Sequence, residues 1–329
     1  MKAAVVPSVN GKWEVKQWET PKAGPNQVVM KIHASGLCYT DVHITHGTIP
    51  AQFPRVLGHE PVGEIVEVGP GVTARKLGDR VGVGWVQKGD GTCEWCLRGK
   101  KELCKNPIAA TGITLQGSHA EYMLAYADAT MPIPDGLSYE QAAPIFCAGY
   151  TVWSGLRRGD PKPHERVAVV GVGGLGHLAL QYSKAAGFET IAVTKSKDKE
   201  KMIRDLGADE IVESGEKLLA AGGADVLLAT SNSWAATEEA ALGMRPGGRV
   251  VVMGASDEPL RFSMNMMLSG VAMIGSSQNG PEYLYEALDF VARGKVKVVE
   301  EIYKLDDINK AYDRVAEGKV RFRAVITMN

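Results

Sequence analysis

Residues 166–187, RVAVVGVGGLGHLALQYSKAAG, constrain the fold more than any other part of the chain. They begin as a short apolar run typical of a buried strand and continue with apolar side chains at helical spacing. Between the two parts, Gly171, Gly173 and Gly176 form the pattern G-x-G-x-x-G. At such a junction the glycines permit a tight turn, close approach of a pyrophosphate, and close packing of helix on strand. The stretch therefore predicts a dinucleotide site at a helix N-terminus.

The two halves of the sequence differ in their pattern of apolar and turn residues. Up to residue 148, short β-type runs are broken by Gly, Pro and Asp, which is typical of an irregular all-β unit. From about residue 165, apolar strands alternate with helical patterns, which indicates a parallel sheet covered by helices on both faces. We therefore expect an α/β protein with a Rossmann doubly wound domain at 149–278, inserted into a β domain formed by 1–148 and 279–329.

The end of the second predicted Rossmann strand indicates which cofactor is preferred. NAD sites usually place Asp or Glu there, where the carboxylate binds the ribose hydroxyls. This chain instead has Thr194, followed by Lys195 and Ser196. A carboxylate would repel a 2′-phosphate, whereas hydroxyls and a lysine would bind it. We therefore predict that NADP(H) is preferred over NAD(H), with Gly174 and Leu175 of the glycine turn also contacting the cofactor.

Composition excludes several classes of partner. The formal net charge of −1 gives no reason to expect nucleic acid or an anionic membrane surface as a partner. No stretch approaches the roughly 18 consecutive apolar residues of a membrane span. The N-terminus reads as a strand and turn rather than a signal peptide, so the cytoplasm is the expected location. Five cysteines, three of them clustered, favour metal binding over a disulfide framework.

Three distant segments each carry good zinc ligands: GLCYTDVH at 36–43, GHE at 58–60 and FCAGYT at 146–151. Cysteine thiolate and histidine nitrogen are the ligands that zinc prefers, and three protein ligands leave a fourth position for substrate. Together with the glycine turn, and with LGHEPVGEIVEVGPGV, GDRVGVGW, CEWCLRGKKELC, CAGYTVW and MRPGG, these segments resemble the zinc-dependent medium-chain alcohol dehydrogenases over essentially the whole chain.

The resemblance implies a GroES-like first domain, an active site in the cleft between the domains, and assembly as a homodimer or homotetramer through the Rossmann sheet. It also implies roles for individual residues. Cys38, His59 and Cys147 would hold a catalytic zinc, with Glu60 as an intermittent or close outer ligand. Asp41 would orient His59. The remaining roles are Thr40 as acceptor of the alcohol proton, His43 as relay to solvent, Lys199 at the adenosine ribose and Arg323 at the pyrophosphate.

The lobe at 90–104 departs from the family pattern. The family's structural zinc site has the spacing C-x2-C-x2-C-x7-C, and this chain supplies Cys93, Cys96 and Cys104 with Asp90 in the first place. A carboxylate oxygen is an acceptable zinc ligand, so we expect a second zinc closed by Asp90. A lobe that loses its zinc easily, or one held by packing alone, are the alternatives.

The substrate is the least constrained feature. The resemblance places Tyr39, Ile49 and Trp85 near it, with packing in the core as the alternative for Trp85. Ile49 stands where some short-alcohol enzymes carry tryptophan, which suggests a roomier pocket for primary, aromatic or medium-chain alcohols and their aldehydes. Four further histidines are expected to be structural: His33, His46, His119 and His177.

The sequence thus predicts an oxidoreductase that transfers hydride between an alcohol and NAD(P). A zinc polyol or sugar dehydrogenase is the alternative among enzymes, although such enzymes often carry a carboxylate where this chain has Cys147. From a different class, a cofactor-binding relative without turnover is disfavoured, because Cys38, Thr40, His43, His59 and Cys147 are all present.

Overall fold

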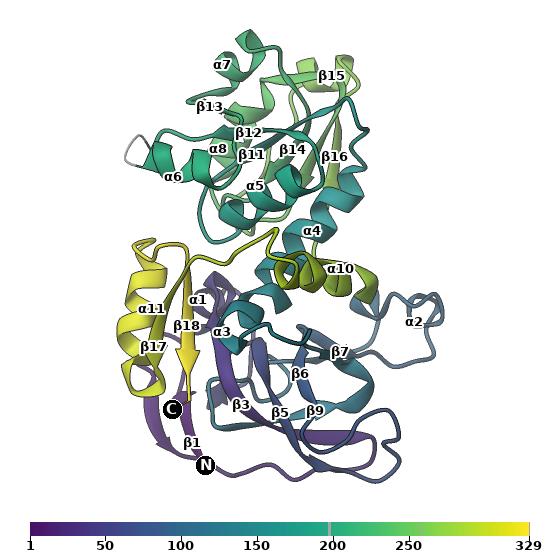
Figure 1. Cartoon of the computed structure of the whole chain (residues 1–329), viewed down its shortest axis with the longest axis vertical. Helices are drawn as coiled ribbons and strands as arrows, with labels where there is room; N and C mark the ends of the chain where they lie inside the picture. The colour runs from purple at the N-terminus through teal and green to yellow at the C-terminus, as the bar shows by residue number, and fades with distance from the viewer. Residues whose placement is uncertain (197–198, 257, 329) are drawn as a thin grey trace. The chain divides into compact units, whose positions relative to one another are not determined.

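The computed structural model describes residues 1–196, 199–256 and 258–328. The chain divides into two compact units, one of residues 1–147 with 298–329 and one of residues 148–297 (Figure 1). Within the described ranges, no helix is long and apolar enough to cross a membrane.

The first unit is built mainly from antiparallel strands. Its elements, in chain order, are β1 (Lys2–Val6), β2 (Glu14–Gln17), β3 (Gln27–Leu37), α1 (Tyr39–Thr45), β4 (Arg55–Val56), β5 (Glu60–Val68), β6 (Arg80–Val83), β7 (Val86–Lys88), α2 (Glu94–Leu97), β8 (Ala109–Ala110), β9 (Tyr122–Tyr126), β10 (Thr130–Pro132), α3 (Tyr139–Ala142), β17 (Glu300–Lys304), α11 (Ile308–Ala316) and β18 (Arg323–Thr327).

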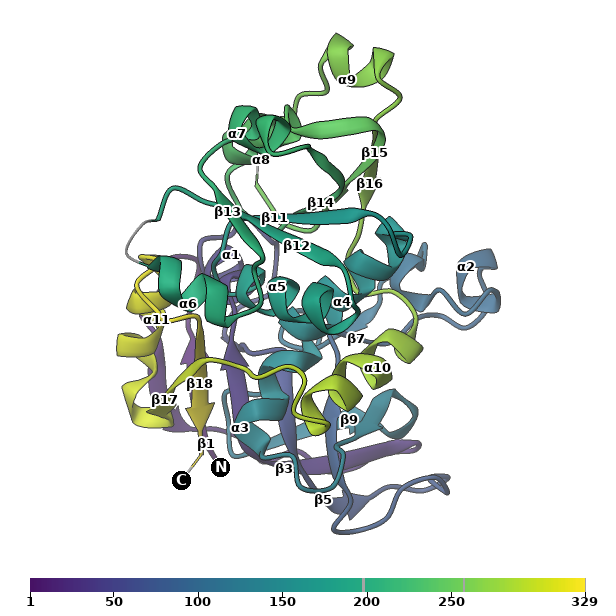
Figure 2. The ribbon, with the colours of Figure 1, turned by 45° about the horizontal axis from the view of Figure 1, so that its top comes forward.

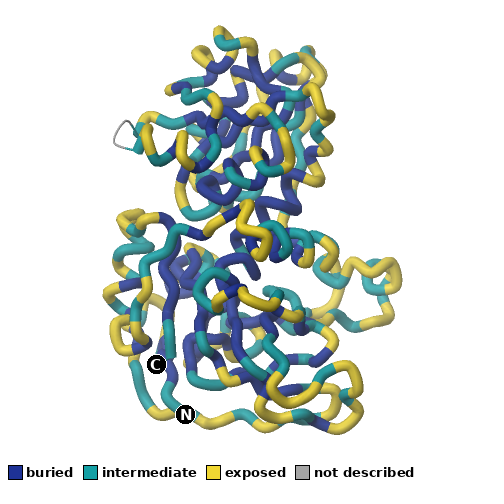
Figure 3. The backbone as a smooth tube through the Cα atoms, viewed as in Figure 1, coloured by how far each residue is buried: buried dark blue, intermediate teal, exposed yellow. Residues whose placement is uncertain are grey.

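Its large sheet has the strand order β10-β6-β5-β3-β18-β17, with β9 paired to β3. The central strand β3 is antiparallel to both β5 and β18, and its end pairs Gly36 with Glu60 and Leu37 with Ala324. Three polar residues therefore meet at one end of the sheet, because Cys38 follows β3, Glu60 opens β5 and Arg323 opens β18. Figure 3 shows that the strands of this sheet are mostly buried.

The second unit has the predicted Rossmann architecture. Its elements are α4 (Ala148–Gly159), β11 (Arg166–Val170), α5 (Gly176–Ala185), β12 (Glu189–Val193), α6 (Glu200–Asp205), β13 (Glu210–Val212), α7 (Gly215–Ala220), β14 (Ala224–Ala229), α8 (Trp234–Ala241), β15 (Met244–Val252), α9 (Met264–Leu268), β16 (Ala272–Gly275) and α10 (Pro281–Ala292).

Its six strands are parallel in the order β13-β12-β11-β14-β15-β16. Helices cover both faces: Leu218 of α7 packs with Leu227 and Val250, while Gly159 of α4 lies against Val226 and Val251. The strand order reverses between β11 and β14, and open sheets of this kind bind ligands beyond the carboxyl ends of the strands at that point. Figure 2 shows β16 beside β15 at the edge of the sheet, with α9 nearby.

The return to the first unit comes at Val298, whereas the sequence placed it after residue 278. The difference is due to α10, which packs on α4 with the rings of Phe290 and Trp153 4.8 Å apart. Residues 279–297 therefore belong with the Rossmann sheet.

Candidate metal centres and cofactor site

The first site begins where β3 turns into α1. Cys38 is the N-cap of α1, and Asp41 accepts a hydrogen bond from the Cys38 backbone N–H at 2.9 Å. This reciprocal arrangement resembles a capping box, which satisfies free N–H groups at a helix start. The short sequence CYTD thus starts the helix directly after Cys38 and buries Asp41 completely.

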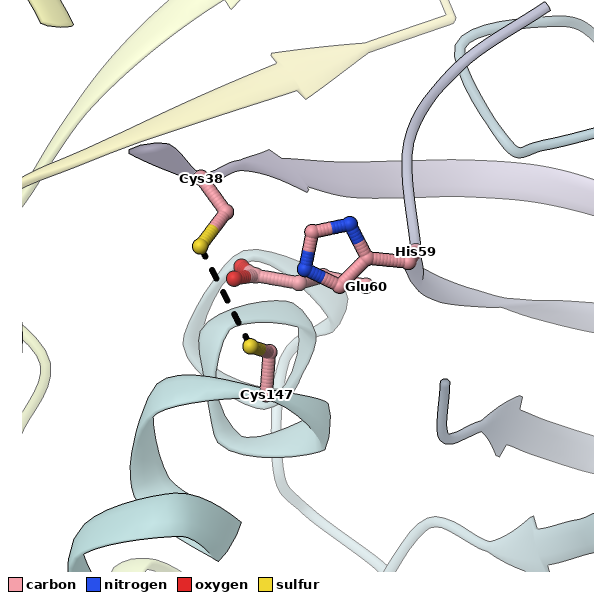
Figure 4. Close-up of side chains that lie close together, drawn as sticks. All are labelled: Cys38, His59, Glu60 and Cys147. Carbon is pink, nitrogen blue, oxygen red and sulfur yellow. Dashed lines mark hydrogen bonds between the residues drawn. The ribbon is translucent and has the colours of Figure 1, made fainter. Parts of the chain in front are cut away.

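Four of the predicted ligands gather in one cluster. Ligand atoms of Cys38, His59, Glu60 and Cys147 all lie within 4.8 Å of one another. Figure 4 shows the Glu60 carboxylate and one edge of the His59 ring facing the two thiols. The Sγ atoms of Cys38 and Cys147 are 4.0 Å apart. All five cysteines of the chain are free thiols, as the sequence predicted.

The dimensions of this cluster fit a tetrahedral zinc ion. With Zn–S bonds of about 2.3 Å, two thiolates on one zinc lie about 3.8 Å apart, close to the observed separation. His59 Nε2 is buried and has no hydrogen-bond partner in the described part of the chain, which is costly unless a ligand occupies that position. A thiol pair and an unpartnered imidazole nitrogen are the donor set of a zinc site with room for one more ligand.

The charges of the cluster are strongly coupled. The contact with Cys147 is the main reason why the pKa of Cys38 lies well below its usual value. His59 lowers this pKa further, whereas burial opposes the shift. The Cys38 thiol and burial both raise the pKa of Cys147. One thiol of the pair therefore ionises far more readily than the other when no cation is bound.

Glu60 is buried against Arg323. Burial raises the pKa of Glu60 to about 7, and the Arg323 guanidinium opposes that rise. The two side chains form a buried ion pair through Glu60 Oε1 and Arg323 Nη2, while Glu60 Oε2 has no hydrogen-bond partner among the residues that the structure describes. Arg323, predicted at a pyrophosphate, thus lies beside the metal cluster in this structure and pairs with one of its carboxylate oxygens.

Asp41 contacts the His59 nitrogen that faces away from the cluster. Its Oδ1 lies 3.6 Å from His59 Nδ1 and accepts the Gly58 N–H at 3.0 Å. Burial favours the neutral form of Asp41, but His59 and His119 hold its pKa below its usual range. The carboxylate is therefore charged and favours a His59 tautomer whose other nitrogen faces the cluster.

A second cluster lies in the lobe around α2. Ligand atoms of Asp90, Cys93, Cys96 and Cys104 lie within 4.8 Å of one another, and Cys93 Sγ is 3.9 Å from Cys104 Sγ. This separation again matches two thiolates on one zinc. A Cβ at Gly89 would lie 2.5 Å from Cys96 Sγ, so the backbone is in close contact with the cluster.

The Asp90 carboxylate is oriented by hydrogen bonds on both oxygens. Its Oδ1 accepts the N–H groups of Thr92 and Cys93 at 2.8 and 2.9 Å, and its Oδ2 accepts Asn106 Nδ2 at 2.6 Å. The backbone N–H groups of Cys93 and Thr92, with the side-chain amide of Asn106, hold the pKa of Asp90 below its usual range. By contrast, burial raises the pKa of Cys96 to about 12. An amide is not among the ligands that zinc prefers, so no motif pointed to the role of Asn106.

The glycine turn of the second unit has the predicted form. Gly171 has φ +89°, and a Cβ there would lie 2.7 Å from Ser231 Cβ. A Cβ at Gly176 would overlap the Gly171 carbonyl oxygen, whereas a Cβ at Gly173 would meet nothing within 4 Å. The first and third glycines are thus required by packing. The second glycine, Gly173, borders open space near the start of α5, and an approaching phosphate needs such space.

Thr194 directly follows β12 and has a defined hydrogen-bond pattern. Its backbone N–H donates to Val212 O at 2.9 Å, and its Oγ1 accepts the Ser196 N–H at 3.2 Å. Because the hydroxyl is an acceptor in that bond, its own proton remains available to a ligand. Lys195 is exposed, and Lys199 caps α6.

The predicted proton-transfer and substrate residues lie mostly on α1. Thr40 Oγ1 is 3.6 Å from Cys38 Sγ, and the rings of Tyr39 and His43 meet edge to face at 5.0 Å. Ile49 is partly buried against the core around Leu57. Trp85, also partly buried, lies between β6 and β7.

Of the histidines expected to be structural, His33 stacks on Tyr139 at 4.4 Å, and His177 Nδ1 lies 2.9 Å from Gly174 O. His46 Nε2 lies 3.3 Å from Tyr312 Oη. His119 is different, because its Nε2 is 3.8 Å from Asp41 Oδ2.

Comparison with known proteins gives a consistent result. Residues 24–135 match the family described as alcohol dehydrogenase GroES-like domain, and residues 174–293 match the zinc-binding dehydrogenase family. An alcohol dehydrogenase of Geobacillus stearothermophilus is 41% identical, and the match covers 100% of each chain. The alcohol dehydrogenase of Aeropyrum pernix is 30% identical with a TM-score of 0.91, covering 99% of this chain and 100% of the other. A cinnamyl alcohol dehydrogenase of Sorghum bicolor is 29% identical with a TM-score of 0.90, covering 99% and 97%.

The full-length matches agree with a fold in which a GroES-like unit carries the donor clusters and a Rossmann unit carries the glycine turn. The chain therefore belongs to the zinc-dependent medium-chain dehydrogenase family of oxidoreductases.

Proposed function

We propose that this protein is a zinc-dependent alcohol dehydrogenase that interconverts an alcohol and its carbonyl compound with a nicotinamide cofactor. The observation that carries the proposal is the buried cluster of Cys38, His59 and Cys147, whose spacing and unpartnered imidazole nitrogen suit a zinc ion with an open position. Its relatives are named alcohol dehydrogenases, which supports the same reaction.

In this proposal each residue has a separate task. Cys38, His59 and Cys147 hold the zinc, Glu60 lies close to it, and Asp41 fixes the His59 ring. Zinc, when bound, supplies Lewis acidity that lowers the pKa of an alcohol hydroxyl and polarises a carbonyl in the reverse reaction. The nicotinamide, when bound, supplies the hydride acceptor.

Thr40 is the proposed acceptor of the hydroxyl proton. Its Oγ1 lies near Cys38 Sγ and can both accept and donate a proton. His43 is on the same short helix and partly exposed, which suits a group that passes the proton on to solvent. Tyr39, Ile49 and Trp85 are proposed to line the substrate site, with primary, aromatic or medium-chain alcohols as the expected class.

The proposed cofactor is NADP(H) in preference to NAD(H). The end of β12 offers the Thr194 hydroxyl proton and the exposed Lys195 ammonium, with no carboxylate at position 194 to oppose a 2′-phosphate. Ser196 and Lys199 add a hydroxyl and a cation nearby in the chain. The glycine turn, with Gly174 and Leu175, is proposed to bind the pyrophosphate, to which Arg323 also contributes.

A second zinc is proposed in the lobe, held by Asp90, Cys93, Cys96 and Cys104. The matched thiol separation and the oriented carboxylate support it. Zinc there would stabilise the lobe without a part in turnover, because the site has four protein ligands and no open position.

Self-association through the Rossmann sheet is proposed as well. β16 is an edge strand, and exposed apolar side chains of the adjoining α9, Met264, Met267 and Leu268, are 57–75% accessible. Native proteins protect such edges in several ways, and covering the edge is one of them. Sedimentation would give a dimer or tetramer, and a monomer at micromolar concentration would contradict this proposal.

The decisive experiment is steady-state turnover of a panel of alcohols and aldehydes with NAD(H) and NADP(H), before and after treatment with a chelator. Chelator-sensitive turnover supports the proposed reaction, and a higher kcat/KM with NADP(H) supports the cofactor assignment. Activity confined to polyols or sugars would favour the alternative dehydrogenase class. Cofactor binding without turnover of any substrate would overturn the proposal in favour of a non-catalytic relative.

A further inference from the structure

His119 is fully buried, although it belongs to a loop far in sequence from the metal ligands. Its backbone N–H donates to Leu57 O at 3.0 Å, and its carbonyl oxygen accepts the Ala4 N–H at 2.8 Å. Gly58, with φ +94°, lies so close that a Cβ there would be 2.8 Å from His119 Cδ2. The ring is therefore held rigidly against the segment that leads into His59.

The surroundings of the His119 ring are partly apolar. The Trp13 ring lies 5.5 Å from it, and neither imidazole nitrogen has a hydrogen-bond partner among the described residues. Burying an imidazole in this way costs free energy that a phenylalanine in the same space would not. The anionic group that the ring faces is Asp41, whose Oδ2 is 3.8 Å from Nε2.

Two backbone donors and two imidazole rings converge on Asp41. Backbone N–H groups of Cys38 and Gly58 donate to Oδ2 and Oδ1, respectively. The two imidazoles face the same two oxygens, His119 at Oδ2 and His59 at Oδ1. A contact on each oxygen opposes rotation of the carboxylate, and that rotation would carry Oδ1 away from His59 Nδ1.

We propose that His119 is a positioning residue for the metal site, acting through Asp41 on His59. An N–H at His119 Nε2 attracts Asp41 Oδ2 across 3.8 Å, which keeps Oδ1 opposite His59 Nδ1 and His59 Nε2 directed at the metal. This inference rests on the zinc site of the proposed function. It assigns to His119 a task that its sequence position does not reveal.

Two substitutions separate positioning from packing. His119→Phe keeps a ring against Trp13 but removes the N–H, whereas His119→Gln loses the ring but can direct an amide N–H at Asp41. A residue that only fills space tolerates Phe better than Gln, while a positioning residue shows the opposite order. Trp13→Phe is the matched control, because it disturbs the same packing from the other side of the ring.

The readouts are the rate at which zinc passes to a chromophoric chelator and the visible absorption spectrum of the cobalt(II)-substituted protein. The phase of zinc release that parallels loss of turnover reports the Cys38–His59–Cys147 site. Loss of a partner of a metal-binding histidine typically lowers metal affinity by roughly 10–100-fold. We expect His119→Phe to accelerate that phase by about tenfold and to shift the cobalt spectrum. We also expect His119→Gln and Trp13→Phe to stay within about threefold of wild type.

A double-variant cycle tests the route through Asp41. In an Asp41→Asn background, His119→Phe is expected to add little further acceleration, since the two residues act in series. Wild-type release and an unchanged cobalt spectrum in His119→Phe would overturn the inference, as would full additivity with Asp41→Asn. If His119→Phe folds too poorly to load metal, His119→Asn replaces it in the comparison. Its amide is one methylene shorter than that of Gln and so does not reach the position of Nε2. Absence of zinc from the wild-type site would instead overturn the proposed function.

Discussion

Gly36 and Glu60 are register partners at the end of β3 and the start of β5, and a Cβ at position 36 would overlap Glu60 Oε2 and lie 2.7 Å from its Cδ. The Glu60 carboxylate thus occupies the space that a side chain at 36 would take. Because position 36 has no side chain, the Glu60 carboxylate can lie buried beside Arg323 and the other three residues of its cluster.

Gly36→Ala is therefore expected to displace the Glu60 carboxylate. Overpacking of this kind costs about 1–3 kcal/mol of stability. We also expect Gly36→Ala to release zinc faster than wild type. Urea unfolding and chelator kinetics measure the two effects. In a Glu60→Ala background the penalty should shrink, because the overlapping atoms are gone. Gly275→Ala, whose Cβ would meet nothing within 4 Å, controls for the substitution itself. An undiminished penalty in the Glu60→Ala background would contradict this explanation.

Asp90 is expected to matter for the stability of the lobe and not for turnover. Metal analysis of protein purified without chelator should give close to two zinc ions per chain, and Asp90→Ala should give close to one. That variant should lose thermal stability while kcat stays within about twofold of wild type, because the lobe has no open ligand position. Glu94→Ala removes an exposed carboxylate of the same lobe and serves as the control. Fully active wild-type protein with one zinc would refute the second site.

Thr194→Asp should shift the cofactor preference toward NAD(H). The new carboxylate would repel a 2′-phosphate and could accept both ribose hydroxyls of NAD. We expect the ratio of kcat/KM for NADP(H) over NAD(H) to fall by at least roughly tenfold, or about 1.4 kcal/mol. Lys201→Ala, on an exposed and neighbouring part of α6, should leave the ratio unchanged. If the wild type already favours NAD(H), the assignment of Thr194 is wrong.

The ion pair of Glu165 and Arg249 predicts a pH dependence of the second unit. Hydrogen bonding to Arg249, against the opposing effect of burial, lowers the pKa of Glu165 to about 2. Because the folded pKa lies below the unfolded value, the unfolded chain binds more protons as the solution is acidified. The stabilisation is thus fully present above about pH 4.5 and is lost as the pH falls toward 2.

Glu165→Gln should consequently reduce the free energy of unfolding at pH 7 by about 1–2 kcal/mol. The difference in the free energy of unfolding between wild type and Glu165→Gln should disappear as the pH approaches 2. Urea midpoints measured from pH 7 down to pH 2 follow this difference, with the exposed Glu317→Gln as control. A gap that persists at the lowest pH would show that the carboxylate charge is not its cause.

The sequence predicted the Rossmann sheet and the glycine turn well because each depends on local periodicity and on the special backbone freedom of glycine. It also predicted both donor sets, since thiols and imidazoles are rare and chemically distinctive. The Glu60–Arg323 pair was not predictable in the same way, because the two residues lie 263 positions apart and meet only when β18 joins β3. His119 gave no signal either, as a single buried histidine has no pattern.

The boundary after residue 278 was misplaced for a related reason. The amphipathic pattern of α10 shows that the helix packs on something, but only its contact with Trp153 of α4 shows on what. Sequence periodicity identifies a buried face without identifying the surface that covers it.

The division of the first unit into two distant segments sets an order of events during synthesis. The Rossmann unit is one continuous stretch and can fold once residue 297 has been made. The first unit cannot complete its sheet until residues 298–329 supply β17 and β18. Until then the Glu60 carboxylate has no arginine beside it. The nascent protein therefore has all the thiols and imidazoles of its metal clusters well before it has the strand that neutralises their neighbouring carboxylate.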